Sequence, residues 1–355
     1  MAKETNVPVV IPAYEPDERL IVLLEGLAEK EIAPVIVVND GSGTVFDDTF
    51  RDVKSIINEN GVLLEHKTNQ GKGAALKTAF KYALEHYKQA KGVVTADSDG
   101  QHSAECIDKI RKELSNNPDA LVLGTRCFDG EDIPWKSRFG NLITIKVFKI
   151  ATGITVSDTQ TGLRGIPRGF MEQLLSAKEN RFEFEMRMLI DSKDAWPIIE
   201  VPIQTIYDSK ENHSTHFDTV KDSARIYRLL LMRFFKYILS SGSSCLIDLA
   251  LFQLACSFFR TKIVAYVALS TFIARAVSSL YNYAINYKFV FKSKESVKTS
   301  AIKYYGLVII IMCASAILTS LGVYLIPGIP EIIIKVIVDT VLFFASYFIQ
   351  KNLIY

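Results

Sequence analysis

The sequence predicts an α/β domain built on a mostly parallel sheet, followed by an all-α domain of four transmembrane helices. Three observations support this fold class. Short β-branched runs alternate with helical patterns in the first part of the chain, whereas long apolar runs dominate beyond about residue 230. The chain of 355 residues also exceeds what one hydrophobic core usually organises, so we expect two domains.

Five apolar segments predict the strands of the sheet. They are VPVVI before Pro12, PVIVVND ending at Asp40, GVLLEH near Glu65, GVVTAD ending at Asp97 and ALVLGT near Gly124. Helical patterns lie between them at 17–30, 73–87 and 103–115. Strands that are apolar throughout and alternate with helices form parallel sheets covered on both faces. Ligands bind such sheets beyond the carboxyl ends of the strands, so the polar residues there are candidates for a site.

Four polar clusters follow these strands: PAYE at 12–15, NDGS at 39–42, NQGKG at 69–73 and DSDGQH at 97–102. Each by itself is more often an ordinary turn. Four of them at one sheet edge indicate a binding site. No GxxxxGK[ST] loop is present and no GxGxxG follows the first strand, which weakens kinase and dehydrogenase interpretations.

The chemistry of these clusters points to a diphosphate and a divalent cation. Asp97 and Asp99 present carboxylate oxygens two residues apart, and Gln101 offers a carbonyl oxygen. Mg²⁺ binds few carboxylates and completes its octahedron with diphosphate oxygens and water. The helix start at Lys72 offers backbone N–H groups and an ammonium to phosphate. Asp40 is placed to accept hydrogen bonds from a ribose or a base.

The ordered segments VVIPAYEP, VVNDGS, NQGKGAALKTAF, TADSDGQH and LGTR resemble glycosyltransferase family 2 over roughly residues 5 to 230. The resemblance is closer to its dolichol-phosphate mannosyltransferase and polyprenyl-phosphate glucosyltransferase branch. It implies a GT-A fold and a metal, Mg²⁺ or Mn²⁺, at Asp99 and Gln101 with Asp97 beside them. The expected nucleotide-binding residues are Pro12, Ala13, Tyr14, Glu15, Asp40, Gly71, Lys72, Asp97 and Ser98.

The segment SDTQTGLRG at 157–165 matches the acceptor-side loop of the family, in which Asp158 is the usual catalytic candidate. A lipid phosphate has a second pKa of about 6, so it can attack the sugar without a strong base. Orienting the acceptor, or stabilising positive charge at the sugar, therefore suits Asp158 as well as proton abstraction does. Processive synthases of the family carry QxxRW, whereas Gln160 and Arg164 here lack the Trp, which favours transfer of a single sugar.

Three further charged residues are catalytic candidates beside Asp97 and Asp158. Arg126 and Arg138 are candidates for phosphate binding, with a solvated surface charge as an equal alternative. Glu183 and Glu185 lie two apart on a predicted helix, so only one of them can face the site, and we choose Glu183.

Four apolar stretches, 237–258, 263–287, 304–326 and 332–350, each approach the ~20 residues of a spanning helix. The second is the weakest because it contains Arg275, Asn282 and Asn286. Basic residues near the ends of these stretches place both ends of the domain on the cytosolic side. The N-terminal segment lacks the pattern of a signal peptide, so we expect a multi-pass protein of the cell membrane with a cytosolic catalytic domain.

An amphipathic segment at about 218–235 carries Arg225 and Arg228 and is expected to lie along the bilayer surface. The expected domains are 1–212, a juxtamembrane segment 213–235, and 236–355. The last resembles the GtrA-like membrane domain, which implies binding, or flipping, of the lipid-linked sugar. Residues 285–291 and 349–355 form a faint internal repeat.

Ionisable residues within the membrane stretches are costly in lipid and usually face the bundle interior. Pairing for structure, such as Lys335 with Asp339, and a cationic pocket for lipid phosphate are equal alternatives. For the pocket we expect Arg275 as the main contact, with Lys335, Arg225 and Arg228.

These features together predict an inverting, metal-dependent transferase that moves one sugar from a nucleotide sugar to polyprenyl phosphate. A UDP-sugar is favoured and a GDP-sugar is the alternative donor. A glycolipid transporter and a processive polysaccharide synthase are the competing functions. The net charge of only +2 argues against a nucleic-acid partner. The sequence leaves open whether the protein forms a homo-oligomer.

Overall fold

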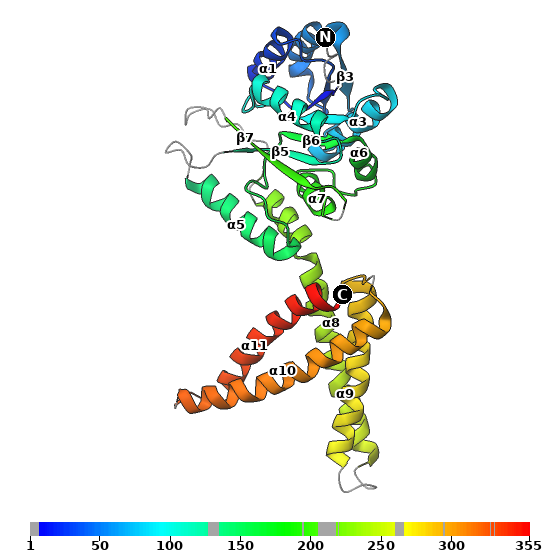
Figure 1. Ribbon diagram of the computed structural model, residues 1–355, viewed down its shortest axis with the longest axis vertical. Helices are drawn as coiled ribbons and strands as arrows, with labels where there is room; N and C mark the ends of the chain where they lie inside the picture. The colour runs from blue at the N-terminus through cyan, green and yellow to red at the C-terminus, as the bar shows by residue number, and fades with distance from the viewer. Residues whose placement is uncertain are drawn as a thin grey trace. The chain divides into compact units, whose positions relative to one another are not determined.

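Figure 1 shows the computed structural model, which describes residues 7–126, 135–193, 195–204, 218, 220–259, 266–293, 295–326, 328–329 and 331–355. Internal contacts divide the chain into two compact units, Met1–Leu230 and Leu231–Tyr355. We call them the sheet unit and the helical unit. The domain boundary expected at 212 lies outside the described residues.

The sheet unit contains a seven-stranded sheet in the order β3-β2-β1-β4-β6-β5-β7. Its strands are β1 (Val9–Ala13), β2 (Val35–Asn39), β3 (Gly61–Glu65), β4 (Gly92–Thr95), β5 (Leu121–Arg126), β6 (Arg164–Pro167) and β7 (Ile198–Ile203). The pairs β1–β2, β1–β4, β2–β3 and β5–β7 are parallel, and β6 runs antiparallel to both β4 and β5. The predicted α/β class with a mostly parallel sheet is confirmed, and β1 to β5 are the five predicted strands.

Helices cover both faces of this sheet. They are α1 (Glu18–Glu29), α2 (Asp47–Ile57), α3 (Lys72–His86), α4 (Ala104–Asn116), α5 (Trp135–Thr152), α6 (Arg168–Leu174) and α7 (Glu183–Asp191). Successive residues of a strand point to opposite faces. Val9 and Ile11 accordingly pack with α1, α2 and α4, whereas Val10 packs with α3, α6 and α7. Figure 1 shows α3 and α6 beside each other at the edge of this sheet. Burial on both faces explains why the strands are apolar throughout.

Strand β6 was missed by the sequence analysis, which treated residues 157–165 as a loop. It is short, and it begins at Arg164 instead of with an apolar run. The Arg164 side chain is fully buried and donates hydrogen bonds to the carbonyls of Thr161 at 2.8 Å and Glu185 at 2.6 Å. The arginine of the TGLRG segment therefore holds this part of the fold together from inside.

The helical unit contains the rest of α8 (Lys221–Phe259), then α9 (Tyr266–Ile285), α10 (Val297–Leu325) and α11 (Glu331–Ile349). In the described part of the chain, three helical segments are long and apolar enough to cross a membrane: Lys221–Phe259, Val297–Ser315 and Val336–Ile354. Within the expected second span, 263–287, residues 266–285 form α9, which is not among these three. Its polar residues, including Arg275, lower its average hydropathy.

The faint sequence repeat is confirmed as a structural one. Helices α9 and α11 each continue into a five-residue π-helix, η3 (Asn286–Val290) and η4 (Gln350–Ile354). The first residues of these π-helices meet, because Asn286 Nδ2 donates to Gln350 Oε1 at 3.2 Å. Both side chains are buried, at 0% and 4% exposure. The two repeats therefore contact each other through a pair of buried amides.

This amide pair is the centre of a polar cluster. Gln350 Nε2 also donates to the hydroxyl groups of Tyr237, at 3.2 Å, and Ser346, at 2.9 Å. Asn286 Nδ2 also donates to Asn282 Oδ1 at 2.8 Å. Buried side-chain hydrogen bonds of this kind hold helices together where lipid removes the hydrophobic driving force.

Replacing Gln350 by Leu keeps the side-chain volume and removes the amide. We expect the free energy of unfolding of the variant to be lower by about 1 kcal/mol, because Asn286 and Tyr237 each lose a buried hydrogen-bond partner. Thermal unfolding of the full chain in detergent measures this. Thr340→Val is the matched control on α11, since its hydroxyl donates to the Val336 carbonyl of the same helix at 2.7 Å. Equal losses of stability in the two variants would show that the amide pair does not stabilise the helical unit.

Candidate active site

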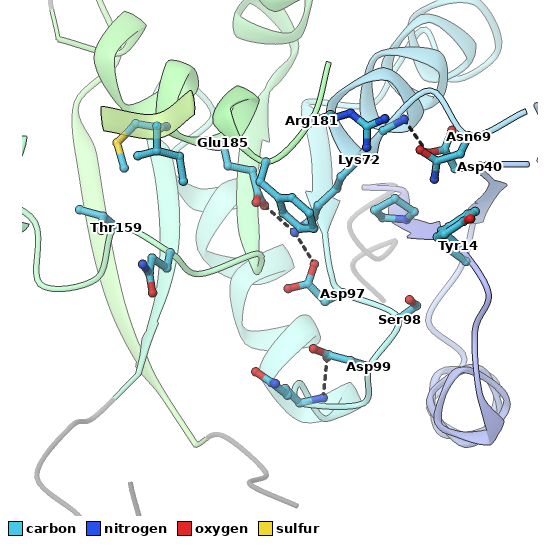
Figure 2. Close-up of a pocket in the computed structure, with 18 of the residues that line it drawn as sticks. Tyr14, Asp40, Asn69, Lys72, Asp97, Ser98, Asp99, Thr159, Arg181 and Glu185 are labelled. Atoms are coloured by element: carbon cyan, nitrogen blue, oxygen red, sulfur yellow. Dashed lines mark hydrogen bonds and ion pairs between the residues drawn. The ribbon is translucent and has the colours of Figure 1, made fainter. Parts of the chain in front are cut away.

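A cavity of about 690 Å³ lies at the carboxyl ends of the strands in the sheet unit. All four polar clusters found in the sequence contribute to its lining, which includes Tyr14, Asp40, Lys72 and Asp99 (Figure 2). The expected nucleotide-binding residues that line it are Pro12, Ala13, Tyr14, Asp40, Gly71, Lys72, Asp97 and Ser98. The parallel strand order brings these residues together from widely separated parts of the sequence.

Glu15 is the expected nucleotide-binding residue that does not line this cavity. It has a positive φ of 47°, and its backbone N–H donates to the Ser42 hydroxyl at 2.8 Å. This contact ties the turn after β1 to the turn after β2. The structure therefore gives Glu15 a place in the framework beneath the cavity.

Asp40 anchors the loop that precedes α3. Its Oδ1 accepts hydrogen bonds from the backbone N–H of Gln70 at 3.0 Å and from His66 Nδ1 at 2.7 Å. Its Oδ2 accepts from the Gly71 N–H at 2.7 Å. The side chain is nearly fully buried. Three protein donors already occupy this carboxylate, so only its remaining lone pairs are available to a ribose or a base.

Lys72 lies between two carboxylates. Its Nζ is 2.6 Å from Asp97 Oδ1 and 2.9 Å from Glu185 Oε1 (Figure 2). Burial opposes a charge on Lys72, but the two negative neighbours outweigh burial and raise the pKa of its ammonium above the usual value. The ammonium expected at a phosphate is therefore held by two acids of the protein.

Asp97, Asp99 and Gln101, the expected metal ligands, all line the cavity. Burial and the charge of Asp97 raise the pKa of Asp99 to about 6. Burial would also raise the pKa of Asp97, but Lys72 and His102 outweigh it and lower that pKa. The described residues contain no cluster of three or more His, Cys, Asp or Glu side chains suited to a metal. Two carboxylates and one amide fit a Mg²⁺ or Mn²⁺ ion whose remaining ligands are diphosphate oxygens and water.

Asp158 is fully buried and faces Arg126, which lines the cavity. The guanidinium binds both carboxylate oxygens, with Nε 2.7 Å from Oδ2 and an Nη 3.0 Å from Oδ1. Burial alone would raise the pKa of Asp158, but the hydrogen bonds and charge of Arg126 and the Gln160 N–H lower it below the usual range. Asp158 is consequently ionised, and it contacts the cavity through Arg126.

The choice of Glu183 over Glu185 was wrong on geometry. Glu185 lines the cavity and pairs with Lys72, whereas Glu183 does not line it. Glu183 begins α7, and its Oε1 accepts a weak bond from the Arg181 N–H at 3.4 Å. Residues two apart on a helix point in different directions, and the chain enters α7 with Glu185 toward the cavity.

The remaining predicted residues lie elsewhere. The side chains of Arg138 in α5 and Lys335 in α11 lie outside the described part of the structure. Arg225 forms an ion pair with Asp222 at 2.6 Å, and Arg228 is exposed. In the helical unit, Arg275 Nε is 3.7 Å from Asp248 Oδ1, and its side chain is 72% exposed. The ion-pair partner of Arg275 is thus an acid of the helical unit itself.

Asn69, Thr159 and Gln160 line the cavity and come from segments that the sequence analysis singled out, without a role given to them there. It missed Arg19, Arg181, Phe182, Met186 and Ile226. Most come from segments without a strand-end signal. Arg181 and Phe182 immediately precede α7, and Ile226 lies in the first turns of α8. Their neighbours in space come from other elements, which a single sequence does not reveal.

The structure contains an α/β domain with a cavity at the carboxyl ends of its strands, followed by a helical unit with segments long and apolar enough to cross a membrane. Residues 9–175 match glycosyl transferase family 2, and residues 236–355 match the GtrA/DPMS transmembrane domain. The chain therefore combines a family 2 glycosyltransferase domain with a GtrA/DPMS membrane domain, and it is a membrane protein.

Three relatives illustrate the comparison with known proteins. An uncharacterised protein of Methanocaldococcus jannaschii is 27% identical over 232 residues, which are 64% of this chain and 92% of that protein. The UDP-N-acetylglucosamine–dolichyl-phosphate N-acetylglucosaminyltransferase of Methanococcus voltae is 28% identical over 250 residues, 65% of this chain and 97% of that protein. The undecaprenyl-phosphate 4-deoxy-4-formamido-L-arabinose transferase of Aeromonas hydrophila is 30% identical over 182 residues, 49% and 52% of the two chains.

Replacing Asp158 by Asn should destabilise the sheet unit by about 3 kcal/mol, because the Arg126 guanidinium loses its ionised partner. The folded-state pKa of Asp158 is depressed, so its contribution is present above the usual carboxyl pKa of about 4. That contribution is lost as the pH falls through the depressed value. The stability difference between wild type and variant should thus be constant from about pH 5 to 8 and narrow below about pH 4.

Both tryptophans of the sequence belong to the sheet unit, where Trp196 stacks on Phe170, so tryptophan fluorescence reports its unfolding in the full chain. Asp48→Asn is the matched control, since the Arg51–Asp48 pair has side chains 76% and 85% exposed. It should cost under about 1 kcal/mol. A loss for Asp158→Asn no larger than for this control would contradict the role given to the buried pair.

Proposed function

We propose that this protein transfers one sugar from a nucleotide sugar to the phosphate of a polyprenyl lipid, with inversion at the anomeric carbon. The observation that carries the proposal is the convergence of four strand-end clusters on one cavity of about 690 Å³. That volume lies within the range of small-molecule sites. The names of the Methanococcus voltae and Aeromonas hydrophila relatives support the lipid phosphate as acceptor, and the former supports a UDP-sugar as donor.

In this proposal the donor diphosphate lies between the turn after β1 and the DSDGQH segment. Asp99 and Gln101, with Asp97 beside them, would hold Mg²⁺ or Mn²⁺, which neutralises charge on the leaving diphosphate when bound. Asp97 and Glu185 are fixed by Lys72. Glu185 keeps a second carboxylate oxygen that is available to hydroxyl groups of the sugar.

The acceptor phosphate supplies its own nucleophile. An ionised phosphate oxygen forms a bond to the anomeric carbon, and the bond from that carbon to the diphosphate oxygen breaks with its electron pair. No proton has to be removed, because the acceptor is ionised near neutral pH. Arg126 lines the cavity and is held there by Asp158, and we assign its guanidinium to the acceptor phosphate. Asp158 then acts by orienting Arg126.

The first turns of α8 would bring the lipid to the cavity. Ile226 and Leu230 are buried in the sheet unit, and Ile226 lines the cavity. Arg225 and Arg228 are exposed on the same turns. A basic surface of this kind attracts anionic headgroups and lipid phosphates. We place the sheet unit on the cytosolic side of a multi-pass membrane protein, with domains at 1–212, 213–235 and 236–355.

Membranes that contain the protein should convert polyprenyl phosphate, a divalent cation and a labelled UDP-sugar into a lipid-extractable product. Asp99→Asn should lower this rate by about 100-fold, because the leaving diphosphate loses its charge neutralisation. Removing divalent cations with a chelator should have a similar effect. Asp52→Asn, an exposed acid on α2, should leave the rate unchanged. An undiminished rate in Asp99→Asn would exclude this metal assignment, and a lack of product with any UDP- or GDP-sugar would exclude the proposed reaction.

The double variant Arg225→Ala/Arg228→Ala should raise the KM for polyprenyl phosphate by roughly 5-fold for each charge removed. The KM for the nucleotide sugar should stay the same, which also shows that the cavity is intact. Arg51→Ala/Lys112→Ala removes two exposed charges from α2 and α4 and is the matched control. An equal rise in both KM values, or a rise in the control as well, would speak against lipid binding by this helix.

A further inference from the structure

Four cationic side chains line the cavity: Arg19, Lys72, Arg126 and Arg181. The first three are committed to acids of the protein. Arg19 Nε is 2.9 Å from Asp17 Oδ1, Lys72 Nζ is 2.6 Å from Asp97 Oδ1, and Arg126 Nε is 2.7 Å from Asp158 Oδ2.

Arg181 differs from these three. Within the described residues, no carboxylate lies at ion-pair distance from its guanidinium. The charged residues that otherwise line the cavity are the acids Asp40, Asp97, Asp99 and Glu185. A ligand with a negative charge therefore meets one cation that it does not have to separate from a protein carboxylate.

The backbone that carries Arg181 is fixed against the start of α3. The Asn180 carbonyl accepts a hydrogen bond from the Ala74 N–H at 2.9 Å, and Asn180 Oδ1 accepts from Lys77 Nζ at 2.6 Å. The stem of Arg181 packs on Gly71, where an added Cβ would lie 2.6 Å from Arg181 Cγ. Although the side chain is exposed at the mouth of the cavity, its base is held in place.

The guanidinium lies at the end of the cavity where the proposed function expects the nucleoside, beside Asp40. Figure 2 shows Arg181 near Lys72 and on the same side as Asp40 and Asn69, away from Asp99. Tyr14 also lies on the side of Asp40 and Asn69 (Figure 2). Arg181 thus shares the end of the cavity that Asp40 and Asn69 line (Figure 2).

From this geometry we infer that Arg181 binds the diphosphate of the donor nucleotide, the role that the sequence suggests for Lys72. The inference rests on the proposed function, since it takes the donor to be a nucleotide sugar. An arginine suits this role because its planar fork donates two parallel hydrogen bonds to phosphate oxygens. Lys72 would first have to leave two carboxylates, which would remain buried without their cation.

The test is direct binding of nucleosides and nucleoside diphosphates to the full chain in detergent, with Mg²⁺ present. Both uridine with UDP and guanosine with GDP are measured, and the pair whose diphosphate binds the wild type is used. Arg181→Ala should weaken diphosphate binding by about 10- to 100-fold and leave nucleoside binding unchanged. Arg181→Lys should give an intermediate loss, because it keeps the charge without the fork. Arg187→Ala is the matched control, because Arg187 pairs with Asp191 on α7 at 2.7 Å and does not line the cavity.

The outcomes separate this inference from the proposed function. If the wild type binds neither diphosphate, the nucleotide-sugar donor itself is wrong. If the wild type binds and Arg181→Ala binds equally well, Arg181 has no part in the site. An equal loss for nucleoside and diphosphate would also overturn the inference, since it would indicate a contact with the base or a disturbed cavity. Tryptophan fluorescence of each variant checks that the sheet unit is folded.

Discussion

The ammonium of Lys72 joins the two sides of the cavity. It connects the end of β4, through Asp97, to helix α7, through Glu185, and it belongs itself to the first turn of α3. Without it, two largely buried carboxylates would face each other close to Asp99. Breaking a buried ion pair by removing one partner is strongly destabilising, because the other charge stays behind. The arrangement of the acids around the expected metal position thus depends on one cation.

Two glycines allow this close approach. A Cβ at Gly162 would lie 2.2 Å from Asp97 Oδ2, and a Cβ at Gly73 would lie 2.5 Å from the Phe184 Cβ. A side chain at either position would push Asp97 or α7 away from Lys72. A side chain at Gly162 is therefore excluded by sterics, whereas Arg164 is needed for its buried hydrogen bonds. Gly162 thus lets residues 157–165 approach Asp97, and Arg164 holds the same segment to α7 through the Glu185 carbonyl.

The first five strands and their polar ends could be predicted because each strand is apolar throughout and ends in a polar cluster. The parallel order then assembles those ends without further information. Strand β6 was missed because it starts at a buried arginine. Glu183 was chosen over Glu185 because the direction of a side chain depends on how the chain enters α7, which the sequence does not reveal. Arg181 carried no signal at all, since its place over Gly71 results from contacts of the Asn180 segment with α3.

The ionisation and the hydrogen bonds of Asp158 affect which kind of reaction the cavity can support. A carboxylate whose pKa is lowered by a bidentate arginine is a weak proton acceptor, and here its two oxygens already accept hydrogen bonds from Arg126 and the Gln160 N–H. Such a group is poorly suited to activate a sugar hydroxyl, which must lose a proton to attack. An acceptor that is already ionised has no such need. The Arg126–Asp158 pair thus agrees better with a phosphate acceptor than with a growing glycan, on grounds independent of the Trp that is missing after Arg164.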